Sequence, residues 1–179
     1  MRCVIAAVLL STVFCSGCAT AADSLPRPSV AVAVVTYIVD GDTFYVQYIT
    51  GGEGLPTKIR PYLIDTPETT RGKLECFGPE ATFFAWQLLF GRTVWLKHYG
   101  RETTDSRLLA FVYLDSQELS LFQAIVVAQG FACIDLQHEE ERPLCVTMQA
   151  LEDQAKSLRL GLWAACQPMC DAPKLCQNP

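Results

Sequence analysis

The sequence has few charged residues and little histidine. Only 18% of its 179 residues are charged, half are hydrophobic, and its two histidines are His98 and His138. This balance excludes an intrinsically disordered chain, and the length suffices for one domain with its own core. There is no internal repeat or low-complexity tract. His98 lies in an apolar stretch and is interpreted as structural, and "HEEER" (138–142) is interpreted as a solvated helix start and not a metal site.

The N-terminus has no apolar run long enough to cross a bilayer. The run "VIAAVLLSTVFC" (4–15) comes after the positive charge of Arg2, is too short to span a membrane, and is followed by small residues, as in a secretory signal. Two endings stay open: an ordinary cleavage site at Ala19 to Ala21, or "SGC", which resembles a bacterial lipoprotein box and makes Cys18 a candidate lipid anchor. We expect an exported protein, either periplasmic, lipid-anchored to the envelope or extracellular. Its expected parts are a signal at 1–21, a linker at 22–29, a domain at 30–165 and a cysteine-rich tail at 166–179.

Six cysteines lie outside the signal: Cys76, Cys133, Cys145, Cys166, Cys170 and Cys176. An even number in an exported domain indicates disulfides, with fifteen pairings open. The alternative is a zinc site in "CQPMCDAPKLC". Its irregular cysteine spacing and the absence of a nearby histidine argue against zinc.

Hydrophobic patterning predicts a small β-barrel with helices at one end. The predicted strands are Ala31–Val39, Thr43–Ile49, Thr57–Ile64, Thr93–Tyr99 and Leu108–Leu114, with Pro61 marking an edge or a bulge. One helix begins at "GPE" (78–80) and ends at Gly91. A second begins at a capping box formed by Ser120 and Gln123. A last helix buries the stripe Leu144, Met148, Leu151, Ala155, Leu158 and Leu162. The expected fold is α+β, mainly a five-stranded OB-fold barrel with three packed α-helices.

Two acidic elements carry the candidate chemistry. "VDGDT" holds Asp40 and Asp42, and "LIDTPE" holds Asp65 and Glu68. Each alone is typical of a turn, and an EF-hand is excluded because Phe44 stands at its fifth position and no glutamate closes it. Two arginines, Arg60 and Arg107, make a functional site more plausible than two ordinary turns. Carboxylates together with guanidinium groups indicate a metal that shares its site with a phosphate.

The ordered motifs "VDGDTF", "IRPYLIDTPE", "ECFGPEA", "DSRLLAFVY" and "GLW" resemble the staphylococcal nuclease (thermonuclease) family over about Val34 to Trp163. The resemblance implies a calcium-dependent nuclease that cuts DNA and RNA and leaves 3′-phosphate ends. It implies calcium ligands at Asp42, Asp65 and the Thr66 carbonyl, a phosphate clamp of Arg60 and Arg107, Glu68 orienting or deprotonating the attacking water, and Asp40 as a supporting acid. The family has tyrosines near the base where this chain has Asp105 and Leu136.

The resemblance also places Cys76 near the active-site loop. We therefore expect a bridge from Cys76 to one of Cys166, Cys170 and Cys176, with the other two paired. A bridge between Cys133 and Cys145, twelve residues apart around an acidic turn, is expected as well.

The net charge of −5 is unusual for a protein that binds nucleic acid. Residues 58–107 hold eight basic and six acidic residues (+2), whereas residues 108–179 hold four and nine (−5). The half with the candidate site is thus the basic one, but electrostatic steering should be weak. We expect a monomer that acts on DNA and RNA. The alternatives are a catalytically inactive OB-fold module that binds nucleic acid or protein, and a disulfide-rich structural or envelope protein.

Overall fold

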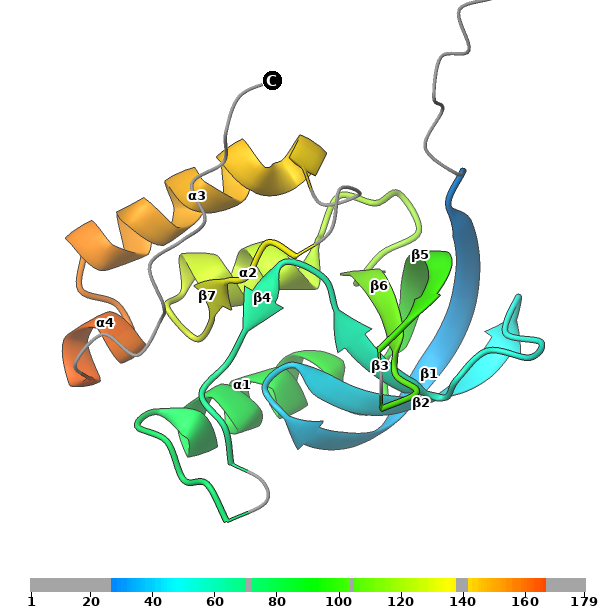
Figure 1. The fold of residues 1–179 in the computed structure, drawn as a ribbon, viewed down its shortest axis with the longest axis horizontal. Helices are drawn as coiled ribbons and strands as arrows, with labels where there is room; N and C mark the ends of the chain where they lie inside the picture. The colour runs from blue at the N-terminus through cyan, green and yellow to red at the C-terminus, as the bar shows by residue number, and fades with distance from the viewer. Residues whose placement is uncertain (1–26, 70–71, 104, 138–141, 167–179) are drawn as a thin grey trace, which may run out of the picture.

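The computed structural model describes residues 27–69, 72–103, 105–137 and 142–166 (Figure 1). Its strands are β1 Ser29–Asp40, β2 Thr43–Thr50, β3 Lys58–Pro61, β4 Ile64–Asp65, β5 Thr93–Glu102, β6 Leu108–Tyr113 and β7 Cys133–Ile134. Its helices are α1 Gly78–Leu89, α2 Phe122–Ala128, α3 Arg142–Ser157 and α4 Leu162–Ala165. The expected signal, most of the expected linker and most of the tail lie outside the described residues, and Ser29, the last residue of the expected linker, already belongs to β1. No helix in the described part of the chain is long and apolar enough to span a bilayer.

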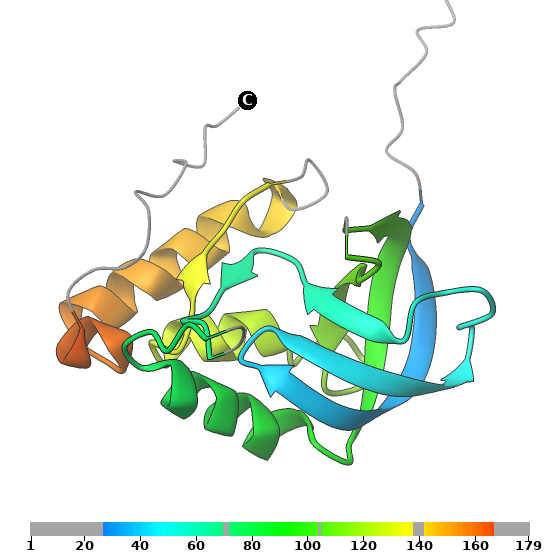
Figure 2. The ribbon, with the colours of Figure 1, turned by 60° about the horizontal axis from the view of Figure 1, so that its bottom comes forward.

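Five strands close into a barrel in the order β1-β2-β3-β6-β5, which confirms the predicted fold. All neighbours are antiparallel except β3 and β6, which are parallel. The long strand β1 pairs with both β2 and β5, and irregularities after Val35 and Ile38 bend it around the barrel. Alternate β1 residues point inward, so Ala31, Ala33 and Val35 are buried. The helices gather on one side of the barrel, with α3 and α4 farthest from β1 and β2 (Figures 1 and 2).

The predicted third strand, Thr57–Ile64, is wrong as one continuous element. It ends at Pro61 as β3, and the chain continues as the separate strand β4, which pairs with β7. Pro61 lacks an N–H for the ladder, and Leu63 has a φ of 69°, in the left-handed region that a branched residue rarely adopts. This turn redirects the chain, so that Asp65 follows a strand that lies outside the barrel.

The first helix is confirmed, but the capping box predicted for the second is wrong. Helix α1 buries Ala81, Ala85 and Leu89, as its pattern predicts. Helix α2 begins after Leu121, and no side chain of the described residues caps it. Gln123 is fully buried instead: its side chain accepts from Val112 N at 3.2 Å and donates to Ala110 O at 3.1 Å. Its amide therefore joins α2 to β6.

The predicted last helix is two helices. Helix α3 ends at Ser157, and Leu158, expected in the buried stripe, is 59% exposed. Arg159, at a φ of 51°, closes a Schellman motif in which Leu160 N donates to Ala155 O at 3.0 Å. The chain then reverses at Gly161, where a Cβ would lie 2.2 Å from Gly130 O, so only glycine fits. Leu162 starts α4 and is buried.

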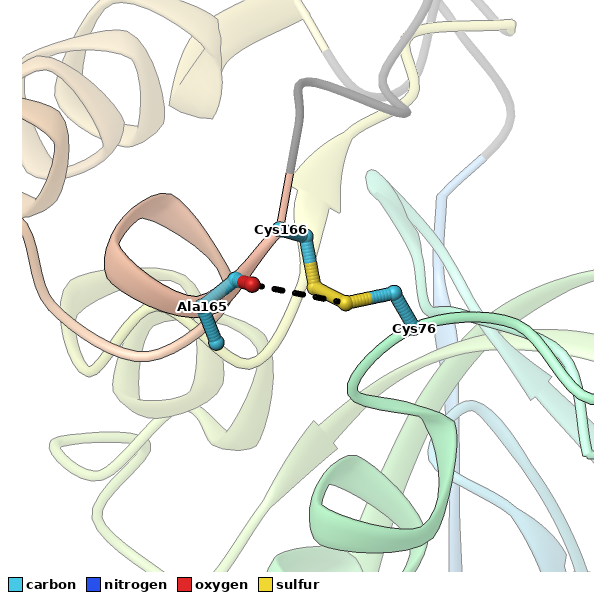
Figure 3. The surroundings of a disulfide bond; sticks show 3 residues. All are labelled: Cys76, Ala165 and Cys166. Carbon is cyan, nitrogen blue, oxygen red and sulfur yellow. Dashed lines mark hydrogen bonds between the residues drawn. A yellow bond between two sulfur atoms is a disulfide. The ribbon is translucent and has the colours of Figure 1, made fainter.

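A disulfide joins Cys76, just before α1, to Cys166, just after α4, as expected (Figure 3). Sγ of Cys76 also lies 3.7 Å from the carbonyl oxygen of Ala165. Cys133 and Cys145 are disulfide-bonded too, and the expected bridge between these two stays a prediction. Cys170 and Cys176 lie outside the described residues.

Candidate active site

The hairpin turn between β1 and β2 presents Asp42 to the end of β4. Asp40 and Thr43 close the turn as a pair, and Asp40 Oδ1 accepts the Asp42 N–H at 3.2 Å. A Cβ on Gly41 would lie 2.8 Å from Thr66 Oγ1, so the turn approaches Thr66 more closely than any other residue allows. The glycine between two aspartates therefore lets the Asp42 carboxylate reach the neighbouring segment.

Asp42 is 2% exposed, and donors surround its carboxylate. Its Oδ2 accepts the backbone N–H of Thr66 at 2.8 Å, and its Oδ1 accepts from the Thr43 hydroxyl at 3.2 Å and from Arg60 Nη1. Burial raises the pKa of Asp42 to about 7, although the Arg60 guanidinium opposes it; the carboxylates of Asp40 and Asp65 raise it further. A carboxylate in so costly an environment gains from any cation beside it.

Arg60 bonds to both acidic elements at once. Besides Asp42, its guanidinium donates from Nη2 to Oδ1 of Asp65 at 2.9 Å and to the carbonyl oxygen of Ile64 at 3.1 Å. The Asp65 side chain is 60% exposed, whereas that of Arg60 is 13% exposed. The two carboxylates are therefore close enough to share one cationic group.

Glu68 lies in the loop after β4, and Glu75 holds its backbone. The Glu68 N–H donates to Oε2 of Glu75 at 2.8 Å, and Glu75 N donates back to Glu68 O at 2.9 Å. Thr69 follows, and its hydroxyl lies 3.2 Å from that of Thr82 on α1. The loop is thus anchored on both sides of the Glu68 side chain.

Arg107 is held by the hairpin that joins β5 to β6. Its Nε and its backbone N both donate to Thr103 Oγ1, at 3.3 and 3.2 Å, and its Nη1 donates to Thr43 Oγ1 at 3.3 Å. The Thr43 hydroxyl also donates to Asp42, so it links this guanidinium to the buried carboxylate. Nη2 of Arg107 lies 3.7 Å from Oδ2 of Asp105.

A cavity of about 210 Å³ brings these groups together. Its polar lining includes Arg60, Asp65, Glu68, Thr103 and Arg107, with Asp135 and Gln137 from the segment after β7. Asp42 lies behind Arg60. Two guanidinium groups and three carboxylates thus line one small polar space, and the two guanidinium groups are suited to an oxyanion such as phosphate.

Residues 58–165 match the family model described as staphylococcal nuclease homologue. The chain belongs to the staphylococcal nuclease family. The match covers most of the chain and includes β3, β4 and the hairpin that carries Arg107. This family of nucleases typically uses calcium. The question is therefore whether the carboxylates of Asp42 and Asp65 suit that ion.

The donors at the site fit calcium in kind. Calcium takes oxygen ligands and can keep several waters. Asp42 and Asp65 converge on one cation, the Arg60 guanidinium. Among the described residues no group of three or more His, Cys, Asp or Glu side chains is placed to hold a metal ion, so a calcium ion here would also need backbone or water oxygens. Arg60 now lies between them and has to move before a metal ion can occupy that place.

Of the residues predicted for the site, the structure brings Asp42, Arg60, Asp65 and Thr66 into one bonded cluster. Glu68 and Arg107 line the adjoining cavity. Thr66 contacts Asp42 through its N–H, and ligation by its carbonyl stays a prediction. Asp40 shapes the hairpin turn.

Sequence reasoning missed several polar residues around this site, namely Thr43, Glu75, Thr103, Asp135 and Gln137. Each is an ordinary loop or strand residue by type, and only the folded chain brings it to the site. "ECFGPEA" did contain Glu75, but as a family motif without a role for that residue.

Proposed function

We propose that this protein is an exported calcium-dependent nuclease that hydrolyses phosphodiester bonds of DNA and RNA and leaves 3′-phosphate ends. Family membership supports the nuclease class. The observation that carries the proposal is the cavity in which Arg60, Asp65, Glu68 and Arg107 meet in front of a buried Asp42.

Each group of site residues has its own chemical role. Asp42, Asp65 and the Thr66 carbonyl would hold calcium, which would supply positive charge beside the phosphate. Glu68 accepts a proton from the attacking water. Arg60 and Arg107 donate to the phosphoryl oxygens as negative charge builds on them.

Positioning is provided by neighbouring groups. The bonds from Glu75 fix the Glu68 backbone, and Thr103 fixes the Arg107 guanidinium. Fixed donors lower the barrier more than mobile ones do, because they need no reorganisation during the reaction.

The alternative is an inactive OB-fold module that binds nucleic acid or protein. Basic and aromatic side chains would serve such a module, and burying Asp42 would only cost it stability. Retention of both acidic elements together with both arginines therefore favours the enzyme.

The test is cleavage of DNA and RNA by the purified chain with calcium, with chelator, and after calcium is restored. We expect cleavage that chelator abolishes and calcium restores. Asp65→Asn changes an exposed side chain and should lower the rate roughly 10²–10³-fold, whereas Asp153→Asn on α3 should not. Undiminished cleavage in chelator, or by Asp65→Asn, would contradict the proposal, and binding without cleavage would favour the inactive module.

Export is part of the proposal. The Cys76–Cys166 disulfide supports it, because such bonds persist in oxidising compartments. Mass spectrometry of the mature N-terminus distinguishes cleavage at Ala21 from lipid attachment at Cys18. An uncleaved Met1 in protein from its native compartment would contradict export.

A further inference from the structure

The cavity at the arginines offers no exposed aromatic ring on which a base could stack. The aromatic residue in its lining, Tyr62, is 1% exposed. At the two places where the family has tyrosines, Asp105 approaches Arg107 and Leu136 packs, half-buried, against the core. A stacking surface for the bases therefore has to lie outside this cavity.

A second, larger hollow lies on the other side of the β5–β6 hairpin. It measures about 510 Å³ and is lined by Tyr45, Lys58, Asp105, Ser106 and the segment 54–57. Different residues of the same two elements line both hollows. Strand β3 gives Arg60 to one and Lys58 to the other, and the hairpin gives Arg107 to one and Ser106 to the other.

An aromatic face with a cation beside it forms part of this hollow. Tyr45 is 37% exposed, and Lys58 Nζ lies 5.9 Å from its ring centroid. Tyr37, 60% exposed, lies on the other side of Tyr45, with 6.2 Å between the ring centroids. Tyr37, Tyr45 and Lys58 thus form a row across the strands β1, β2 and β3. The strand register fixes this row, because Tyr37 pairs with Tyr45 and Tyr45 pairs with Lys58.

The row lies next to the candidate active site, with which it shares the two strands β2 and β3. On β2, Tyr45 comes two residues after Thr43, which bonds Arg107; on β3, Lys58 comes two residues before Arg60. Residues two apart share a face of a strand and are about 6.8 Å apart. That step is close to the span of one nucleotide in an extended strand.

We propose that Tyr45, Tyr37 and Lys58 form a subsite for single-stranded nucleic acid, one nucleotide away from the phosphate held by Arg60 and Arg107. The tyrosine rings stack on an unpaired base, and Lys58 contacts its phosphate. This inference rests on the proposed function. The subsite requires an unpaired base, because a base inside a duplex offers no free face.

Two further observations favour a stacking subsite. The net charge of −5 leaves little long-range attraction for a polyanion, and stacking supplies affinity for any base sequence without added charge. The strands β2 and β3 with their connecting loop also extend away from α3 and α4, so these helices leave the row open (Figures 1 and 2).

The experiment measures binding of a labelled phosphorothioate oligothymidylate by fluorescence anisotropy, with calcium and in a Glu68→Gln background that slows cleavage. Tyr45→Leu keeps the strand apolar and should raise Kd about tenfold, within the range that base stacking gives. Lys58→Met should lower the slope of log Kd against log salt by about 0.7, the value for one phosphate contact on a single strand. Tyr45→Leu should leave that slope unchanged.

Phe90→Leu, at the exposed end of α1, is the matched control and should bind like the parent. In the otherwise wild-type chain, Tyr45→Leu should lower kcat/KM for the oligonucleotide but not for bis(p-nitrophenyl) phosphate, which has no base. If the wild type cleaves both substrates and Tyr45→Leu matches Phe90→Leu in Kd, the subsite is wrong and the proposed function stands. If nothing is cleaved but Kd still depends on Tyr45, the proposed function is wrong and the subsite stands.

Discussion

Nη1 of Arg60 donates to Oδ1 of the buried Asp42, so the guanidinium lies where the proposed calcium would neutralise that carboxylate. The arginine and the metal ion therefore compete for Asp42. We predict that Arg60→Gln binds calcium about tenfold more tightly, because it removes a positive charge a few ångströms from the ion in a poorly solvated place. Turnover should nevertheless fall by about 10²–10³, since a transition-state donor is lost.

Isothermal titration calorimetry with calcium checks the first part and steady-state kinetics the second. Arg92→Gln, exposed after α1, is the control. Weaker calcium binding by Arg60→Gln would show that Arg60 organises the carboxylates and does not compete for them.

A second prediction concerns Glu75, which acts on Glu68 through hydrogen bonds to its backbone. Glu75→Ala should lower kcat about tenfold, the order expected when a general base loses its orientation but stays present. KM and calcium affinity should change little, because Glu75 contacts neither ligand. Glu75→Gln keeps an acceptor oxygen for the Glu68 N–H and should recover part of the loss. Equal losses in both variants would assign Glu75 a role that depends on its charge.

Much of the fold follows from local patterns. Alternation in β1 predicts which of its residues enter the barrel, and the apolar face of α1 predicts its buried residues. The two acidic elements and the two arginines are also visible, because carboxylate and guanidinium side chains have few roles in such an order. These features are short-range, so the sequence displays them directly.

The missed features depend on contacts distant in the sequence. Leu63 bends the chain at a positive φ that its residue type disfavours, and Gln123 turns inward because β6 offers it Val112 N and Ala110 O. The bridge from Arg60 to two carboxylates depends on the turn at Leu63, which precedes Asp65. No periodicity indicates such contacts, since tertiary partners decide them.

A third prediction concerns pH. His98 is 5% exposed, and its Nδ1 accepts the N–H of Gly100 at 3.2 Å. Its Nε2 has no hydrogen-bond partner among the described residues. Burial lowers the pKa of His98. His98 in the unfolded chain therefore binds a proton below about pH 6.5, whereas His98 in the folded chain stays neutral until the pH reaches its lowered pKa.

The stabilising contribution of His98 should thus be complete above about pH 6.5 and fall as the pH drops, by at most about 1.4 kcal/mol per pH unit, until the lowered pKa is reached. Asp42, whose pKa is raised to about 7, contributes with the opposite sign in the same range, so the comparison has to be with a variant. His98→Asn keeps an acceptor for Gly100 and cannot titrate, so the urea unfolding free energy of the wild type should fall relative to that of the variant as the pH drops from 7 to 5. Parallel pH profiles of the two proteins would contradict the assignment.

The last prediction concerns the disulfide between Cys76 and Cys166, which are 90 residues apart (Figure 3). A bridge across so long a loop restricts the unfolded chain and is worth about 2–4 kcal/mol. The double variant Cys76→Ser, Cys166→Ser should therefore melt roughly 5–15 °C lower. It isolates this bridge, whereas a reductant would also act on Cys133 and Cys145. The variant should keep kcat within a few-fold well below its melting temperature, because the bonds from Glu75 to Glu68 do not pass through the disulfide. Calorimetry and nuclease assays on one preparation separate the two effects. A large loss of kcat in fully folded variant would mean that the bridge also positions the loop that carries Glu68.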